Sequence, residues 1–171
     1  MAPRAVLLIL LALVTLGPSA PSPAAGAGGD DAAPRAGSAA TPEEAEYTAA
    51  VTAIERGDFR DAIHRLEGVV ARDGKNAGAY NWLAYAIRRN GDPARSIPLY
   101  QKALALDPKH RGAHEYIGEA YLALDNPVKA REHLGALNSL CFFPCSEYRD
   151  LKKAVEAYEK SGGRVKPAAG R

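Results

Sequence analysis

Residues 77–110 read AGAYNWLAYAIRRNGDPARSIPLYQKALALDPKH, and this stretch decides the fold. Its apolar side chains recur at spacings of three and four residues, which place them on one face of a helix. They form two such stripes, Tyr80, Leu83, Ala84 and Ile87, then Ile97, Tyr100, Ala103 and Leu104. Gly91 lies between the stripes, where the pattern predicts a turn that joins two amphipathic helices into a hairpin. Pro98 falls inside the second helix, where we expect a lost hydrogen bond and a kink.

The same layout recurs along the chain with a period of 34 residues. Its copies start at residues 43, 77 and 111, and no gap is needed to align them. Residues suited to cap a helix stand at one fixed offset in all three copies, at Asp58, Asp92 and Asn126. Pro93 and Pro127 follow two of them, in first-turn positions where the missing N–H costs no hydrogen bond. A fixed period of this length is typical of a stacked helical repeat.

The period and the residues at fixed positions resemble the tetratricopeptide repeat (TPR) family. The middle copy matches the family signature at Tyr80, Leu83, Ala84, Ile87, Gly91, Tyr100, Ala103 and Pro108, and departs from it at Ser96. The third copy matches at Ile117, Gly118, Tyr121, Ala130 and Leu134, and the first, the weakest, at Ala50, Gly57, Asp58, Ala62 and Leu66. The resemblance implies an all-α fold, a short right-handed α-solenoid of three TPR helical hairpins plus a C-terminal capping helix. The repeats would span 43–76, 77–110 and 111–142, and the capping helix 146–160.

The residues before the first repeat differ in composition from the rest. Residues 1–27 have a basic start and an unbroken apolar run over 5–16, which is the build of a secretory signal peptide. That run is too short to span a bilayer comfortably, and an uncleaved membrane anchor is the other interpretation. Residues 28–41 are rich in Ala and Gly, which predicts a disordered linker. We therefore expect a small exported bacterial protein, most simply periplasmic, with no integral membrane span after signal cleavage.

Local signals mark the two ends of the expected TPR domain. Thr41, with Glu44 at the third helical position, is a capping box that begins the first helix. Near the other end, Pro144 disfavours helix at the residue before it, so the last repeat helix should end near Phe142. Ser146 is expected to cap the final helix. The domain would span residues 42–160, and residues 161–171 would form a flexible tail.

In the TPR family the first helices of successive hairpins line a concave face that contacts a ligand. Carried over position by position, the resemblance implies a partner-binding groove of Tyr47, Val51, Ile54, Asn81, Trp82, Tyr85, Arg88, Arg89, Glu115, Glu119 and Leu122. It implies a protein–protein interaction scaffold or adaptor that binds a peptide segment of an envelope protein. Chaperone-binding members clamp a carboxylate with basic residues and asparagines, but the first repeat has Glu44, Tyr47 and Val51 there, so we expect no such clamp.

Two interpretations remain for the central groove residues. Trp82 and Tyr85 belong to the types that dominate interface hot spots, but they could equally pack between repeats. Arg88 and Arg89 suit planar charged contacts with a partner, but they could equally form a solvated helix end that interacts with the helix dipole. The sequence alone does not separate these interpretations.

Cys141 and Cys145 close a five-residue segment, Cys-Phe-Phe-Pro-Cys, where the third repeat departs from its pattern after Leu140. In an oxidising compartment such a pair favours a disulfide that staples the corner between two helices. A redox site or a metal site are the other interpretations, although the Cys-X-X-Cys spacing of thioredoxin-like motifs and of haem attachment is absent. A thiol-dependent chaperone or redox helper is therefore the alternative function.

Charge and motif content give no support to several function classes. Lys and Arg number 22 against 20 Asp and Glu, which gives no electrostatic case for nucleic acid. His110 and His114 have the spacing of a metal pair but no suitably spaced partner ligands, so we expect no metal. No phosphate loop, nucleophile elbow or paired-carboxylate motif occurs. We therefore expect no enzyme activity and no cofactor, while the oligomeric state stays open.

Overall fold

The computed structural model describes residues 40–163, which fold into a stack of helices. The helices are α1 Pro42–Glu55, α2 Phe59–Arg72, α3 Ala77–Arg89, α4 Pro93–Leu106, α5 Arg111–Ala123, α6 Pro127–Leu140 and α7 Ser146–Lys160. The described residues contain no strand. The predicted signal peptide, most of the linker and most of the tail lie outside this range. None of the described helices combines the length and apolar character needed to cross a bilayer.

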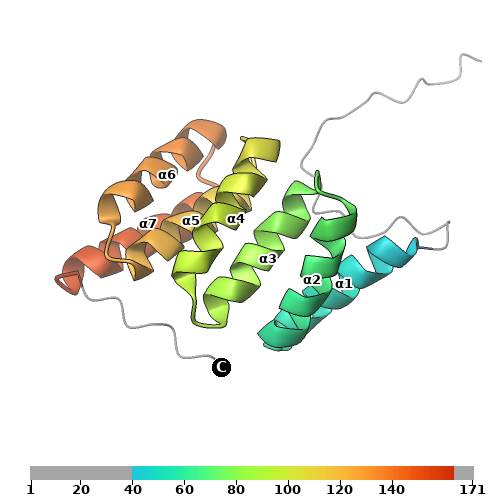
Figure 1. Cartoon of the computed structure of the whole chain (residues 1–171). Helices are drawn as coiled ribbons and strands as arrows, with labels where there is room; N and C mark the ends of the chain where they lie inside the picture. The colour runs from blue at the N-terminus through green and yellow to red at the C-terminus, as the bar shows by residue number, and fades with distance from the viewer. Residues whose placement is uncertain (1–39, 164–171) are drawn as a thin grey trace, which may run out of the picture.

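The helices pair as three antiparallel hairpins, α1 with α2, α3 with α4 and α5 with α6 (Figure 1). Neighbouring hairpins also touch, because α2 packs on α3 and α4 packs on α5. The last helix, α7, lies against both α5 and α6 and covers the end of the stack. The predicted all-α solenoid of helical hairpins with a capping helix is confirmed.

Side-chain caps fix where each repeat helix begins. Asp58, Asp92 and Asn126 each accept a hydrogen bond from the backbone N–H three residues later, as predicted. The Thr41 capping box is also present, with the Thr41 and Glu44 side chains each bonded to the other residue's backbone. Each cap satisfies an N–H that the helix itself leaves without a partner, so these sequence positions set the helix starts.

The corner before α7 differs from the prediction. Helix α6 ends at Leu140, two residues before the expected Phe142, because Cys141 already has an extended backbone. Cys145 is the N-cap of α7 and makes no side-chain capping bond. The predicted capping role of Ser146 is wrong, since Ser146 is the first helical residue and its hydroxyl donates to Glu147. The capping position is the residue before the first helical one, and here that residue is Cys145.

Pro98 lies inside α4, which runs without a break from Pro93 to Leu106. A proline here deprives the carbonyl of Ala94, four residues earlier, of its helical partner. Both Pro98 and Ala94 are exposed, so water can take the place of the missing N–H. The expected kink stays a prediction.

The core is a chain of clusters between hairpins rather than one centre. Leu66 and Val69 of α2 are fully buried in a cluster with residues of α1 and α3. Ile117 of α5 is fully buried in a second cluster with Tyr100 of α4. At the C-terminal end, Leu151 of α7 is fully buried in a third cluster. Each hairpin therefore depends on its neighbour to cover its apolar face, as expected of a solenoid.

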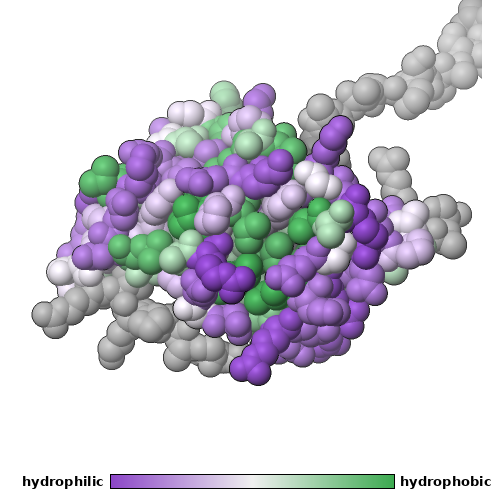
Figure 2. Space-filling model, in the orientation of Figure 1, coloured by the Kyte–Doolittle hydropathy of each residue, from purple (hydrophilic) through white to green (hydrophobic). Residues whose placement is uncertain are grey.

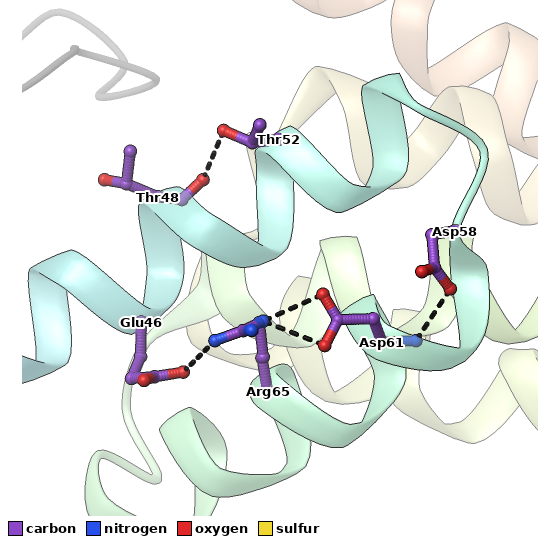
Figure 3. A network of polar contacts seen from close by, with 6 residues as sticks. All are labelled: Glu46, Thr48, Thr52, Asp58, Asp61 and Arg65. Atoms are coloured by element: carbon purple, nitrogen blue, oxygen red, sulfur yellow. Dashed lines mark hydrogen bonds and ion pairs between the residues drawn. The ribbon is translucent and has the colours of Figure 1, made fainter.

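The surface is mixed, with polar side chains over the outer helices. Figure 2 shows hydrophilic groups over α2 and hydrophobic groups gathered over α3 and α4 in the middle of the same face. On the first hairpin, Arg65 joins the two helices, because its guanidinium lies 3.0 Å from Glu46 of α1 and 2.9 Å from Asp61 (Figure 3). These ion pairs are partly exposed, so solvent screening leaves each of them a small contribution to stability.

The close packing of α5 on α7 depends on Gly118. A Cβ placed on Gly118 would lie 2.6 and 2.7 Å from the two Cδ atoms of Leu151, which is fully buried. By contrast, a Cβ on Gly135 in α6 would meet nothing within 4 Å. Of these two glycines, Gly118 is the one that its surroundings require.

We predict opposite effects of the same substitution at these two glycines. Gly118→Ala should lower the free energy of unfolding by about 1–2 kcal/mol, because Leu151 must shift within a packed core. Gly135→Ala should raise it by about 0.5–1 kcal/mol through helix propensity alone. Urea denaturation followed by circular dichroism measures both, and a stabilised Gly118→Ala variant would contradict the packing described here.

Candidate interaction site

The stack brings equivalent positions of successive repeats side by side on α3 and α5. Trp82 of α3 and Tyr116 of α5 are 34 residues apart in the sequence, and their ring centroids are 6.3 Å apart. Tyr85 and Glu119 are the next equivalent pair, one turn further along the two helices. The repeat period thus determines which side chains meet across the hairpin boundary.

A cluster of rings and guanidinium groups covers this boundary. We call it the aromatic–arginine cluster, and its members are Phe59, Trp82, Tyr85, Arg88, Arg89 and Tyr116. The Tyr85 ring is central, with centroids 5.5 Å from Trp82, 4.9 Å from Tyr116 and 6.5 Å from Phe59. All the rings are partly exposed. The two interpretations of Trp82 and Tyr85 are therefore not exclusive, because both rings pack between repeats and keep a free edge.

Arg88 ties the second hairpin to the third. Its guanidinium lies 2.8 Å from the Glu119 carboxylate and donates to the Tyr100 hydroxyl at 3.4 Å. The same group lies over the Tyr85 and Tyr116 rings, at 5.3 and 5.7 Å from their centroids. Only 14% of the Arg88 side chain is exposed, so it is not a solvated helix end.

Arg89 contacts the Tyr85 and Phe59 side chains of the cluster. Its guanidinium donates to the Tyr85 hydroxyl at 2.6 Å and lies 5.1 Å from the centre of the Phe59 ring. Cation–π contacts of this kind hold a planar guanidinium against a ring face. Both arginines therefore hold the Tyr85 ring in place, and the rings are oriented before any partner arrives.

Glu115 and Asn81 occupy equivalent positions on α5 and α3 and are both largely buried. Glu115 is 9% exposed and Asn81 is 2% exposed. Burial, together with the nearby Glu119, Asp150 and Glu147 carboxylates and against the opposing effect of Arg88, raises the pKa of the Glu115 carboxyl to about 8. The Asn81 Oδ1 is buried without a hydrogen-bond donor. Unpaired acceptors of this kind are costly in a folded protein, so both residues need an explanation.

Other predicted groove residues differ in their surroundings. Leu122 was expected to contact a partner but is 3% exposed and packs with Leu151 and Val155 of α7, so that prediction is wrong. The physical reason is that α7 covers the face of α5 that a terminal repeat would otherwise leave open. In the first repeat, Tyr47 and Ile54 are partly buried against the core, and Val51 is also partly buried.

Two members of the aromatic–arginine cluster, Tyr116 and Phe59, are not among the groove residues predicted from the sequence. Tyr116 carries a usable signal, because it lies 34 residues after Trp82 and so shares its repeat position. Phe59 has no such signal, since it belongs to the second helix of the first hairpin and reaches Tyr85 only across the boundary between repeats. Its contact depends on how the hairpins stack.

The cysteine corner places two aromatic rings in solvent. The Sγ atoms of Cys141 and Cys145 lie at bonding distance, and their Cα atoms are 5.8 Å apart. Between them, Phe142 is 94% exposed and Phe143 is 76% exposed. Exposed pairs of large apolar side chains are unusual on a monomeric surface and mark contact sites when they occur.

His114 lies next to His133, a histidine of the following helix. His110 does not face His114, because its Nδ1 accepts the Ala113 N–H and caps α5. Instead, the Nδ1 atoms of His114 and His133 lie 3.0 Å apart, and Tyr121 stacks on His133. Within residues 40–163, no group of three or more His, Cys, Asp or Glu side chains is arranged to hold a metal ion.

Comparison with known families agrees with the repeat pattern. Two family models, each described as tetratricopeptide repeat, match residues 47–110 and residues 88–155. Together they cover α2 to α6 and most of the flanking helices. Among curated proteins, none matches this sequence.

Solved structures of similar fold include three complexes with peptides or chaperone segments. The TPR2B domain of yeast Sti1, in a pHsp70 complex, has a TM-score of 0.64 and 18% identity, over 70% of this chain and 97% of that one. The Yersinia enterocolitica type III secretion chaperone SycD, in complex with a peptide of the translocator YopD, has a TM-score of 0.61 and 17% identity. The match covers 70% of this chain and 93% of that one. The first TPR of Spaghetti (RPAP3), bound to HSP90 peptide SRMEEVD, has a TM-score of 0.61 and 19% identity. The match covers 68% of this chain and 93% of that one. At these identities the likeness shows the fold alone.

We predict that Arg88 contributes more to stability than the partly exposed Arg65 does. Arg88→Met should lower the free energy of unfolding by about 2–4 kcal/mol, because Glu119 is left beside Glu115 without its cation. Arg65→Met, which breaks partly exposed pairs, should lower the free energy of unfolding clearly less than Arg88→Met does. Urea denaturation provides the comparison, and equal effects of the two substitutions would show that Arg88 does not join the hairpins as described.

The His114–His133 pair predicts a loss of stability in acid. Burial and, to a smaller extent, the neighbouring His114 lower the pKa of His133 to about 4. Since the unfolded value is about 6.5, this histidine contributes stability above pH 6.5 that is lost as the pH falls toward 4. Between pH 7 and pH 4.5, the free energy of unfolding should fall by roughly 2 kcal/mol less in His133→Gln than in the wild type. The exposed His64→Gln is the control, and a wild-type pH dependence in His133→Gln would refute the assignment.

Proposed function

Because this chain belongs to the tetratricopeptide repeat family, we propose that it is a protein–protein interaction scaffold that binds a peptide segment on the face formed by α3 and α5. The observation that carries the proposal is the aromatic–arginine cluster. Its rings are partly exposed, yet Arg88 and Arg89 hold them in place. Rigid aromatic side chains that keep a free edge supply contact area at low entropic cost.

Peptide-bound relatives support the kind of partner. The SycD and Spaghetti structures hold peptides on the same fold, which makes a short segment the natural ligand for three hairpins. We place the protein in the periplasm, where the segment would belong to an envelope protein, because the N-terminal sequence has the build of a signal peptide. In that oxidising compartment Cys141 and Cys145 form a disulfide that fixes the corner between α6 and α7.

Panning a random peptide-display library on the purified chain tests the proposal. Tyr85→Ala should weaken the selected peptides about tenfold or more, because it removes the central ring of the cluster. The matched control is Tyr80→Ala, which removes a tyrosine from another face of α3, where its ring lies 5.8 Å from the Lys102 ammonium of α4. Fluorescence anisotropy with labelled peptides measures both, and equal losses in the two variants would place binding elsewhere.

A second candidate function is a thiol-dependent chaperone or redox helper at the cysteine corner. It is favoured by the two exposed phenylalanines, which lie directly between Cys141 and Cys145 and could hold an unfolded segment near the sulfurs. Replacing both cysteines by serine separates the two functions. If peptide capture survives with only a lower melting temperature, the cysteine pair is structural; if capture is lost while the fold persists, the thiol function is correct.

A further inference from the structure

Glu115 is a buried carboxylate that the fold leaves without a counter-charge. It is 9% exposed, and within residues 40–163 it makes no hydrogen bond and no ion pair. A buried charge without a partner is strongly unfavourable. Part of the side chain is still open to solvent, and Glu147 and Asp150 of α7 lie near it.

The groups that face Glu115 make its environment acidic. They are Glu119 on α5, Glu147 and Asp150 on α7, and Arg88 on α3. Arg88 is already paired with Glu119 at 2.8 Å, and Arg111 is paired with Glu147 at 3.6 Å. Four carboxylates and two guanidinium groups leave a local excess of negative charge. The fold therefore supplies no free cation for Glu115.

Asn81 adds a second, independent sign of an unfilled contact. Its amide makes no hydrogen bond, and its Oδ1 is buried without a donor. The amide lies against the first turn of α5, since a Cβ on Gly112 would be 3.7 Å from its Nδ2. Gly112 is three residues before Glu115 and so lies on the same side of that helix. The Asn81 Oδ1 and the Glu115 carboxylate are therefore two acceptors that the described residues leave without a donor.

We propose that the partner segment carries a lysine or arginine side chain that binds at Glu115, between α5 and α7. This inference rests on the proposed peptide-binding function. Lysine and arginine bring only donors and a positive charge, which is what unpaired acceptors require. The Tyr116 ring is partly exposed and close enough to Glu115 to feel its charge, so it can cover the alkyl stem. A bare metal ion is disfavoured, because the described side chains include no metal-binding group of three or more.

The proposed basic side chain has the opposite charge to most charged residues of the peptide bound to one relative. The segment bound to Spaghetti, SRMEEVD, has three acidic residues. Here an acidic segment would meet Glu115, Glu147 and Asp150 and would be repelled. The partner of this chain should therefore differ in charge from that of a protein with the same fold.

The first test uses the peptides selected on the purified chain. Their sequences should be enriched in lysine or arginine next to an apolar residue. Replacing that basic residue by glutamine in a labelled synthetic peptide should weaken binding at least about tenfold. Selection of acidic peptides, or no loss on this replacement, would overturn the inference. This arm alters only the peptide, so it does not depend on how any protein variant folds.

The second test changes the protein. Glu115→Gln keeps the size of the side chain and should weaken the basic peptide at least about tenfold. Glu67→Gln on α2, exposed and outside the cluster, makes the same change in net charge and should leave the affinity within about twofold. Equal effects of the two substitutions would show that only long-range charge matters, which contradicts a specific contact.

The pH dependence of binding gives a separate readout. A bound cation favours the ionised form of Glu115, so binding releases a proton from the free protein, where the pKa is about 8. Affinity for the basic peptide should therefore rise by about tenfold or more between pH 6 and pH 9. Glu115→Gln should abolish this rise, although Glu119, Glu147, Asp150 and Arg88 are still present. A rise that persists in Glu115→Gln would overturn the assignment.

Failure of the inference can be told apart from failure of the proposed function. If selected peptides lose affinity in Tyr85→Ala but carry no basic residue, the chain binds peptides on the α3–α5 face and the role of Glu115 is refuted. If no selected peptide depends on Tyr85, the proposed function fails and the inference fails with it.

Discussion

The Arg88–Glu119 ion pair is the interaction on which the rest of the site depends. It joins the second hairpin to the third with one largely buried guanidinium, and the same group orients the Tyr85 and Tyr116 rings. The same pair also explains why Glu115 has no counter-charge. Because Arg88 is already paired with Glu119, the Glu115 carboxylate is left without a cation, and Glu147 and Asp150 of α7 lie near it. One pairing therefore creates both the rigid aromatic surface and the unpaired acid.

Rigidity at this site comes from the stacking of repeats. Helices α3 and α5 lie next to each other because their hairpins share a 34-residue register, and α7 then covers the open end. The closing helix brings Glu147 and Asp150 toward α5 and at the same time buries Leu122. A terminal cap thus has two effects, since it completes the core and changes the charge of the binding face.

The same local chemistry has different consequences at different depths. Arg65 and Arg88 both pair with carboxylates, yet one is a third exposed and the other is largely enclosed. Solvent weakens the first pair, while the second gains strength from a lower dielectric and from the aromatic rings around it. Depth in the stack decides which ion pair matters for the fold and the site.

The sequence alone determined the hairpins and their starts. The 34-residue spacing and the capping residues at positions 58, 92 and 126 act within one or two helical turns, so local chemistry suffices to predict them. It also placed Trp82, Tyr85 and Arg88 on one side of α3, and repeat spacing could have added Tyr116.

Only the tertiary structure decided the burial of Leu122, the inclusion of Phe59, the His114–His133 contact and the isolation of Glu115. Each depends on which helices meet, and at what depth. The physical reason is that a helical period specifies the direction of a side chain from its own axis, whereas burial and charge pairing depend on neighbours that the chain brings in from other repeats.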